Sequence, residues 1–320
     1  MKEALGKIFS FLSAAKKQIF IGILSVFAFI VILFPFNDLS DLVSTQVAQL
    51  TNNQVFVQFE DLKLSLLSGI GLELKGVYVE GTQIPTISAD EIIVSPSVSG
   101  MIKQLPYGKI TANGLLKGSA QVRVSGGTPT ENNKPRTHVE LDAENIALKS
   151  LREMITLPIP IDGKISTQSS FQIEPNFQEQ PDGDVVLKID NFELPPASVE
   201  TQMGPLTLPD LKLKSLELKG RMYSGRFDVQ EGKIGTPADE LYGTVKGHLE
   251  VTYTPKEGTK FGGYNFDVDL KVKKSLHSRA SLFLVLLDAY KTETPEGPQF
   301  KLKIAGSNFI EPPRFEPLRK

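Results

Sequence analysis

The chain has 320 residues, of which 40% are hydrophobic and 22% are charged, and its formal net charge is −2. A chain so close to neutral has no excess of basic side chains for a polyanion, so nucleic acid is not an expected partner. Cysteine is absent, which excludes disulfides, thiolate zinc sites and cysteine catalysis.

The first predicted element is an uncharged, apolar run over residues 19–36. A helix through it would reach roughly 27 Å at about 1.5 Å per residue, close to the thickness of a bilayer core. The run is too long for the apolar part of a signal peptide, and no small-residue cleavage pattern follows it. We therefore expect a retained membrane span rather than a buried helix of a soluble protein. Its membrane-spanning residues include Ile19, Phe20, Ile23, Leu24, Phe27, Ile30, Val31 and Phe34.

The charges that flank this run are asymmetric. Lys2, Lys7, Lys16 and Lys17 precede it, whereas Asp38 and Asp41 follow it. Lysine-rich flanks stay on the cytoplasmic side of a membrane. The sequence thus predicts a cytoplasmic N-terminus at 1–18, a transmembrane helix at 19–36 in the inner (plasma) membrane, and a periplasmic β-rich domain at 37–320.

After the span, apolar residues recur at every second position. In "FDVDLKVK" (266–273) the apolar side chains lie on one face of the predicted strand and the charged ones on the other. Such alternation is typical of antiparallel sheets with one solvated face. The expected fold class is mainly β, with antiparallel, curved or twisted sheet(s) and a few short helices. Residues expected to line an apolar groove or a core face are Val185, Leu187, Ile189, Phe266, Val268 and Leu270.

Helical spacing of apolar residues interrupts the strands in three places. It predicts helices near residues 38–50, 145–156 and 275–290. Because strands flank all three, we expect these helices to cover the apolar face of the sheet rather than to lie on a membrane surface.

Residues that could carry chemistry are sparse. The histidines His138, His248 and His277 are far apart and match no metal-binding spacing, and no nucleophile or phosphate-loop motif occurs. Neighbouring carboxylates, Asp267 with Asp269 and Asp239 with Glu240, are expected on exposed positions, where they serve solubility. The sequence predicts no catalytic, cofactor-binding or metal-binding residues, and hence a protein that is not an enzyme.

Two parts of the chain carry a resemblance to known families. Residues 52–81, "NNQVFVQFED" onward, and residues 87–102, "ISADEIIVSPSVSGMI", resemble the opening of AsmA-type proteins. Residues 213–251 and 281–317 are similar to the type II secretion system protein N family. This resemblance implies an inner-membrane-anchored accessory component of a secretion apparatus, with other subunits of that system as partners. The AsmA-like part implies a second function, binding or transfer of phospholipid in an apolar β groove, and a third reading is an AsmA-type envelope protein with no secretion role.

Alternation alone does not decide whether the apolar face is a covered core or an open groove. A self-packed sandwich core is favoured, because a long exposed apolar face promotes aggregation. Any groove is then expected to be confined to one end of the sheet.

Overall fold

The alternating segments form strands in a computed structural model of the chain. The structure describes residues 39–65, 71–81, 86–103, 105, 107–129, 135–154, 160–175, 177–201, 204–254, 258–308 and 311–318, together with 18, 20–22, 25, 26 and 29. It is mainly antiparallel β, with one large curved sheet and a few short helices. The predicted fold class is confirmed for the sheet and for the short helices.

The large sheet has sixteen strands that follow one another almost in chain order. They are β1 (Val55–Gln58), β2 (Asp61–Ser65), β3 (Gly71–Gly81), β4 (Ile87–Pro96), β5 (Gly108–Leu115), β6 (Gly118–Gly126), β7 (Thr137–Ala147), β8 (Asp162–Ile173), β9 (Asp182–Leu194), β12 (Leu211–Tyr223), β13 (Arg226–Ile234), β14 (Leu241–Thr254), β15 (Gly258–Val272), β16 (Lys291–Thr294), β17 (Gly297–Gly306) and β18 (Arg314–Pro317). A separate hairpin, β10 (Ala197–Thr201) and β11 (Gly204–Leu208), joins β9 to β12.

The helices are short and lie outside the sheet. They are α3 (Ser40–Leu50), α4 (Val98–Lys103), α5 (Leu148–Met154), α6 (Lys274–Arg279), α7 (Ser281–Leu284) and the 3-10 helix η2 (Val285–Tyr290). The three predicted helical stretches are therefore present, although residues up to Ala147 remain in β7 and α5 begins later than expected. Helix α4 was not predicted.

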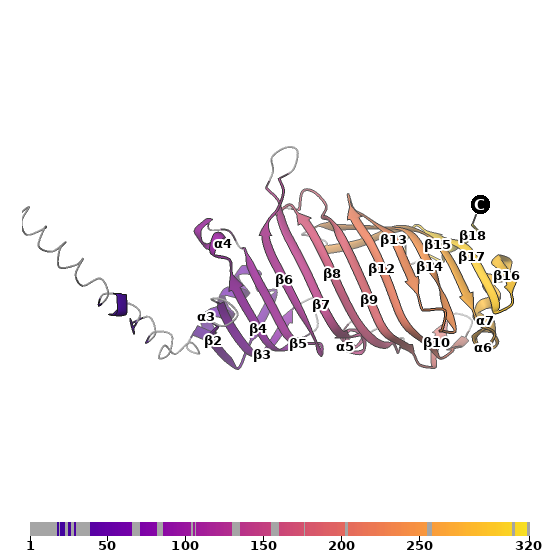
Figure 1. Ribbon diagram of the computed structural model, residues 1–320, viewed down its shortest axis with the longest axis horizontal. Coiled ribbons are helices and arrows are strands. Elements are labelled where there is room, and N and C mark those ends of the chain that lie inside the picture. The colour runs from indigo at the N-terminus through magenta and orange to yellow at the C-terminus, as the bar shows by residue number, and fades with distance from the viewer. Residues whose placement is uncertain are drawn as a thin grey trace, which may run out of the picture.

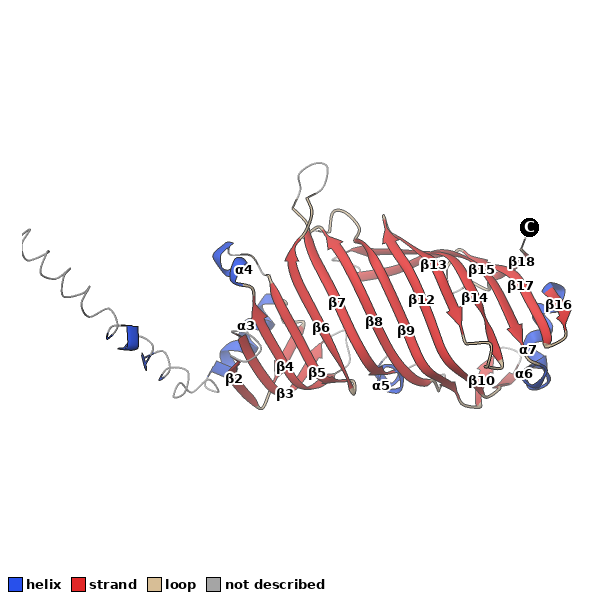
Figure 2. Cartoon of the chain, viewed as in Figure 1, coloured by secondary structure: helices blue, strands red, loops and turns tan. Residues whose placement is uncertain are grey.

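The strands stand side by side along the long axis of the molecule (Figures 1 and 2). The ladder runs from β1 through β3 to β9, then through β12 to β15, and ends at β17 and β16. At about 4.8 Å between neighbours, it extends over roughly 60 Å. Among the described strands no pairing joins the two ends, so the sheet is open.

Because neighbouring strands run in opposite directions, their connections gather along two long edges. Helix α4 connects β4 to β5 on one edge. Helix α5, the β10–β11 hairpin and α6 lie on the other (Figure 1). These are named here the α4 edge and the α5 edge.

The register aligns apolar residues across the whole sheet. One row of directly opposed residues starts at Leu62 on β2 and ends at Leu302 on β17, passing through Leu74, Ile92, Ala112, Ala120, Ala143, Thr167, Leu187, Leu218, Gly232, Val245 and Val268. No member of this row is charged. The adjacent row, one residue along each strand, is Lys63, Glu73, Ile93, Thr111, Gln121, Asp142, Gln168, Val186, Lys219 and Glu231. The sheet thus has an apolar face and a polar face.

Fully buried clusters form at the two ends of the apolar face. At the N-terminal end, Leu39 and Val43 of the α3 region pack against Leu62, Leu74 and Val77. At the C-terminal end, Leu276 of α6 and Ala280, the residue after it, belong to a second cluster. Its strand members are Val268, Val272, Phe300 and Leu302, and Leu284, Leu287 and Tyr290 of α7 and η2 pack around it. Helices therefore cap both ends of the face.

Between these caps, little covers the apolar face. Apart from ladder neighbours, the described elements that pack closely on strands are α3 on β1, α5 on β7 and β8, and α6 and η2 on β17. The expectation of a self-packed sandwich is wrong, because the described strands form one continuous sheet instead of two that face each other. Among the described elements, helices cover the ends of the apolar face, and none packs closely over its middle.

Glycines prevent steric clashes between the neighbouring strands β13, β14 and β15. A Cβ atom on Gly232 would lie 2.3 Å from Val245 Cγ1, and one on Gly243 would lie 2.1 Å from the Asp269 carbonyl oxygen. Gly247 combines a φ of +146° with a Cβ position only 2.1 Å from the Asn265 carbonyl oxygen. Side chains at these positions would push neighbouring strands apart, so the glycines permit the close, curved arrangement.

We expect Gly247→Ala to destabilise the protein by more than about 1 kcal/mol, because alanine fits neither the backbone angle nor the space. The measurement is the midpoint of urea unfolding followed by far-UV circular dichroism. Gly263→Ala is the matched control, since its nearest neighbour lies at an ordinary 3.5 Å. Equal losses in both variants would contradict the steric explanation.

Candidate functional site

One feature open to a ligand is the middle of the apolar face, over which no described element packs closely and which is named here the trough. Strand β9 shows its character. Val185, Leu187 and Ile189 point to the apolar face and are half-buried, whereas Val186 on the polar face of the same strand is 39% exposed. No described helix packs closely over these three residues, so their partial burial comes from neighbouring side chains on the same face of the sheet.

The six residues predicted to line a core or a groove all lie on this face, but in two different surroundings. Val268 is only 5% exposed and belongs to the C-terminal cluster, with Phe266 and Leu270 packed partly buried against it. Val185, Leu187 and Ile189 lie in the trough, where the described elements leave them uncovered. One part of the face is core and the other is open.

The walls of the trough offer a ligand almost no polar atoms. Its aligned row is uncharged, and the hydroxyl groups that occur there already have partners. Thr167 Oγ1 donates to the Val186 carbonyl oxygen at 3.0 Å and lies 3.2 Å from Ser169 Oγ. A surface of this kind favours hydrocarbon and disfavours polar or charged ligands, which would lose hydration without gaining hydrogen bonds.

The predicted carboxylate pairs lie away from the trough. On the polar face, Asp269 accepts a hydrogen bond from Gln299 Nε2 at 2.6 Å and pairs with Lys301 at 3.5 Å, and Asp267 pairs with Lys303 at 3.9 Å. In the β13–β14 loop, Asp239 Oδ2 accepts hydrogen bonds from the Thr236 and Lys214 backbone amides at 2.6 and 3.1 Å. These contacts give the carboxylates structural partners.

The histidines are separate from one another as well. His138 lies on the polar face, with Nε2 3.2 Å from Glu140 Oε1 and Nδ1 2.9 Å from Gln172 Nε2. In the part of the chain that the structure describes, no group of three or more His, Asp or Glu side chains is arranged to hold a metal ion.

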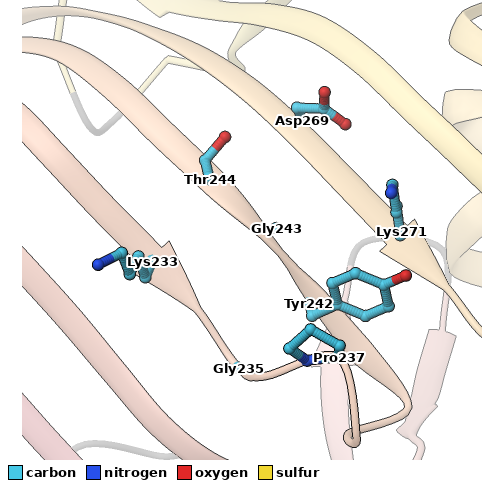
Figure 3. A pocket seen from close by; sticks show the side chains of 8 residues that line it. All are labelled: Lys233, Gly235, Pro237, Tyr242, Gly243, Thr244, Asp269 and Lys271. Carbon is cyan, nitrogen blue, oxygen red and sulfur yellow. The ribbon is translucent and has the colours of Figure 1, made fainter.

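A small pocket of about 370 Å³ opens on the polar face near the α5 edge (Figure 3). It lies over Gly235 and Gly243. Its polar side chains interact with their neighbours: the Tyr242 hydroxyl donates to Glu296 Oε2 at 2.9 Å, which raises the pKa of Tyr242, and the Lys271 ammonium lies 5.5 Å from the centre of the Tyr242 ring. The pocket combines no nucleophile with a base, so we assign it no chemistry.

The C-terminal cap of the trough is held by an ionic latch at the α5 edge. Arg279 of α6 donates to Glu240 through Nη1 at 3.2 Å and Nη2 at 2.5 Å, and Ser275 Oγ donates to the same carboxylate at 2.5 Å. The hydrogen bonds from Arg279 and then Ser275 lower the pKa of Glu240 below its ordinary value of 4.5. The carboxylate therefore stays ionised and keeps α6 attached to the β13–β14 loop.

We expect Glu240→Gln to lower the melting temperature modestly at neutral pH and to have less effect in acid. The folded pKa is depressed, so the ionised carboxylate stabilises the fold above its unfolded pKa, and this contribution is lost as pH falls through the folded pKa. The measurement is the difference in Tm between wild type and variant at about pH 7 and about pH 3.5. Glu193→Gln, which removes an exposed partner of Lys212, is the control. A difference that grows in acid would contradict the latch.

Only part of the predicted membrane span can be compared with the structure. Phe20, Ile21, Val26 and Phe29 are helical, and more than half of each is exposed. Ile19, Ile23, Leu24, Phe27, Ile30, Val31 and Phe34 lie outside the described residues. Among the residues that are described, no helix has the length and hydrophobicity needed to cross a membrane.

Sequence reasoning missed helix α4 and the residues after it. Val98 and Ile102 are 71% and 79% exposed, and Leu105 is exposed as well. Their spacing of four and three residues is the signal that could have revealed a short helix with one apolar side.

Comparison of the chain with models of protein families, with curated proteins and with solved structures finds no match.

Proposed function

We propose that this chain is a membrane-anchored, non-enzymatic protein that binds lipid acyl chains along its trough. The observation that supports this function best is the uncharged row of opposed residues, which continues across the sheet between two capped ends and over whose middle no described element packs closely. A soluble domain normally covers such a surface, so a face left open suits a hydrophobic ligand.

The dimensions of the trough fit this ligand. An acyl chain of one leaflet is roughly 15 Å long, half the thickness of the bilayer core. Between the two caps the trough crosses β5 to β9 and β12, which at about 4.8 Å between strands is roughly 25 Å, so it has room for the length of one acyl chain. Each methylene group removed from water contributes about 0.8 kcal/mol, which makes a chain of ordinary length bind without any polar contact.

The proposed anchor is the run at 19–36, with the N-terminus in the cytoplasm and the sheet in the periplasm. The exposed apolar side chains of Phe20, Ile21, Val26 and Phe29 suit a lipid surrounding, and the flanking charges support this orientation. Only a few residues separate Phe36 from Ser40, where α3 starts, which limits that gap to roughly 14 Å. The capped N-terminal end of the trough would therefore lie close to the bilayer.

Photo-crosslinking of lipid to the full-length chain tests the function. The chain would be reconstituted with a phospholipid that carries a diazirine near the middle of its acyl chain, and the labelled peptides would be identified by mass spectrometry. We expect adducts on apolar-face residues of β7, β8, β9 and β12. Adducts restricted to 19–36, or equally frequent on the polar face, would refute acyl-chain binding in the trough.

A second candidate function is that of an accessory component of a type II secretion system, for which the resemblance of residues 213–251 and 281–317 is the main support. One structural feature favours it: β18, at the end of the sheet farthest from the proposed anchor, has all four residues exposed, and strand edges are common sites of protein association. Cross-linking in cells, with a photoreactive residue at Glu316, would capture other secretion subunits if this function is correct. Capture of none of them would argue against it.

A further inference from the structure

A second exposed apolar surface lies at the α4 edge, outside the trough. It consists of Val98, Ile102 and Leu105 and is named here the α4 tip. Val98 and Ile102 are among the most exposed large apolar residues that the structure describes. The tip is smaller than a standard protein interface, which takes about 800 Å² from each partner.

A basic pocket of about 460 Å³ lies beside the tip, where β4 and β6 end and β5 begins. Its lining includes Lys103, Lys109 and Arg123 and no acidic residue. Arg123 pairs with Glu140 at 2.8 Å, whereas Lys103 and Lys109 make no hydrogen bond or ion pair with any residue that the structure describes. Two lysines with no partner among the described residues, beside the hydroxyl groups of Ser95, Ser97 and Ser99, suit the phosphates of lipid headgroups.

Exposed residues of the apolar face lie near the tip as well. Val94 on β4 and Ile110 on β5 are directly opposed on the apolar face, and both are exposed large apolar residues. They lie near the α4 ends of their strands, and Val98 comes four residues after Val94 in the chain. Exposed apolar residues therefore occur both on the tip and on the apolar face at the same edge of the sheet.

We infer that the α4 tip docks on a bilayer with anionic headgroups and makes the α4 edge the mouth of the trough. The apolar side chains of Val98, Ile102 and Leu105 enter the boundary between headgroups and acyl chains, while Lys103 and Lys109 contact phosphate groups. Apolar residues beside basic ones are the usual composition of elements that lie at a membrane surface. The inference that the α4 edge is the entrance to the trough rests on the proposed binding of acyl chains. The inference that the α4 tip docks on a bilayer does not.

Single-cysteine labelling tests the docking, because the natural chain has no cysteine to interfere. The full-length Ile102→Cys variant would be labelled with an environment-sensitive fluorophore and reconstituted in vesicles of phosphatidylcholine with phosphatidylglycerol. We expect a blue-shifted emission, quenched by lipids with spin labels near the headgroup. Val285→Cys, an exposed apolar position at the C-terminal cap, is the matched control and should stay accessible to aqueous iodide. A label at position 102 that iodide quenches as readily as the control would overturn the inference.

A charge reversal tests the role of the lysines. In the labelled Ile102→Cys chain, adding Lys103→Glu and Lys109→Glu should abolish the difference in emission between anionic and purely zwitterionic vesicles. Lys149→Glu on α5, at the opposite edge, should leave that difference unchanged. An unchanged difference in the double variant would refute phosphate contact by these lysines.

Crosslinking to the trough, measured on the same vesicles, separates the two proposals. Trough adducts without insertion of the label at position 102 would refute docking and leave acyl-chain binding. Insertion without trough adducts would refute acyl-chain binding and leave docking.

Discussion

Val268→Asp is expected to unfold the C-terminal half of the sheet. Val268 is 5% exposed and packs with Phe300, Leu302 and Leu276 under the α6 cap. An aspartate there would bury an unpaired carboxylate or force it to take up a proton, at a cost of roughly 3 to 5 kcal/mol, a large fraction of the stability of a typical domain.

The measurement is urea unfolding of the full-length chain followed by circular dichroism. Thr252→Asp, on an exposed position of β14, is the control for adding a negative charge to the same region and should unfold like wild type. A Val268→Asp chain with the stability of this control would show that the C-terminal cluster is not a core.

Leu187→Asp is expected to have the opposite outcome, although Leu187 and Val268 belong to the same row of opposed residues. Leu187 is half-buried and no described element covers it, so a carboxylate there can meet water when the trough is empty. The fold should survive. Acyl-chain binding should weaken at least tenfold, or about 1.4 kcal/mol, because a bound chain would have to displace water from the charge.

The measurements are the unfolding midpoint and the yield of trough adducts with the diazirine phospholipid. Val186→Asp places the same charge on the adjacent residue, which points to the polar face, and should preserve both. If Leu187→Asp unfolds as readily as Val268→Asp, the trough is a core; if it binds lipid like Val186→Asp, the ligand lies elsewhere.

These two substitutions also show where prediction from sequence ends. Alternation in "VVLKID" and "FDVDLKVK" correctly placed Leu187 and Val268 on apolar faces of antiparallel strands, because side chains on a strand point to opposite sides in turn. The pattern is the same for a face covered by helices and for one that is open. What separates the two residues is the position of α6, which depends on contacts between distant parts of the chain.

The register of the strands could not be predicted from the sequence either. The uncharged row depends on how each strand aligns with the next, and irregularities such as the shift between Lys219 and Gly220 alter that alignment. The α4 tip was missed for a different reason. It rests on one helix of six residues between two strands, too short for apolar spacing to stand out from the alternation around it.

Because the strands pair with their neighbours almost in chain order, the length of the sheet can change with the number of strands. Each strand in the middle of the sheet rests mainly on the one before and the one after, as repeats do in a linear array, while the caps pack on the strands near each end. Insertion or deletion of one complete hairpin would preserve the direction of every following strand and leave both caps intact. It would change the span of the sheet by roughly 10 Å, so the length of the sheet can be altered by gaining or losing strands two at a time.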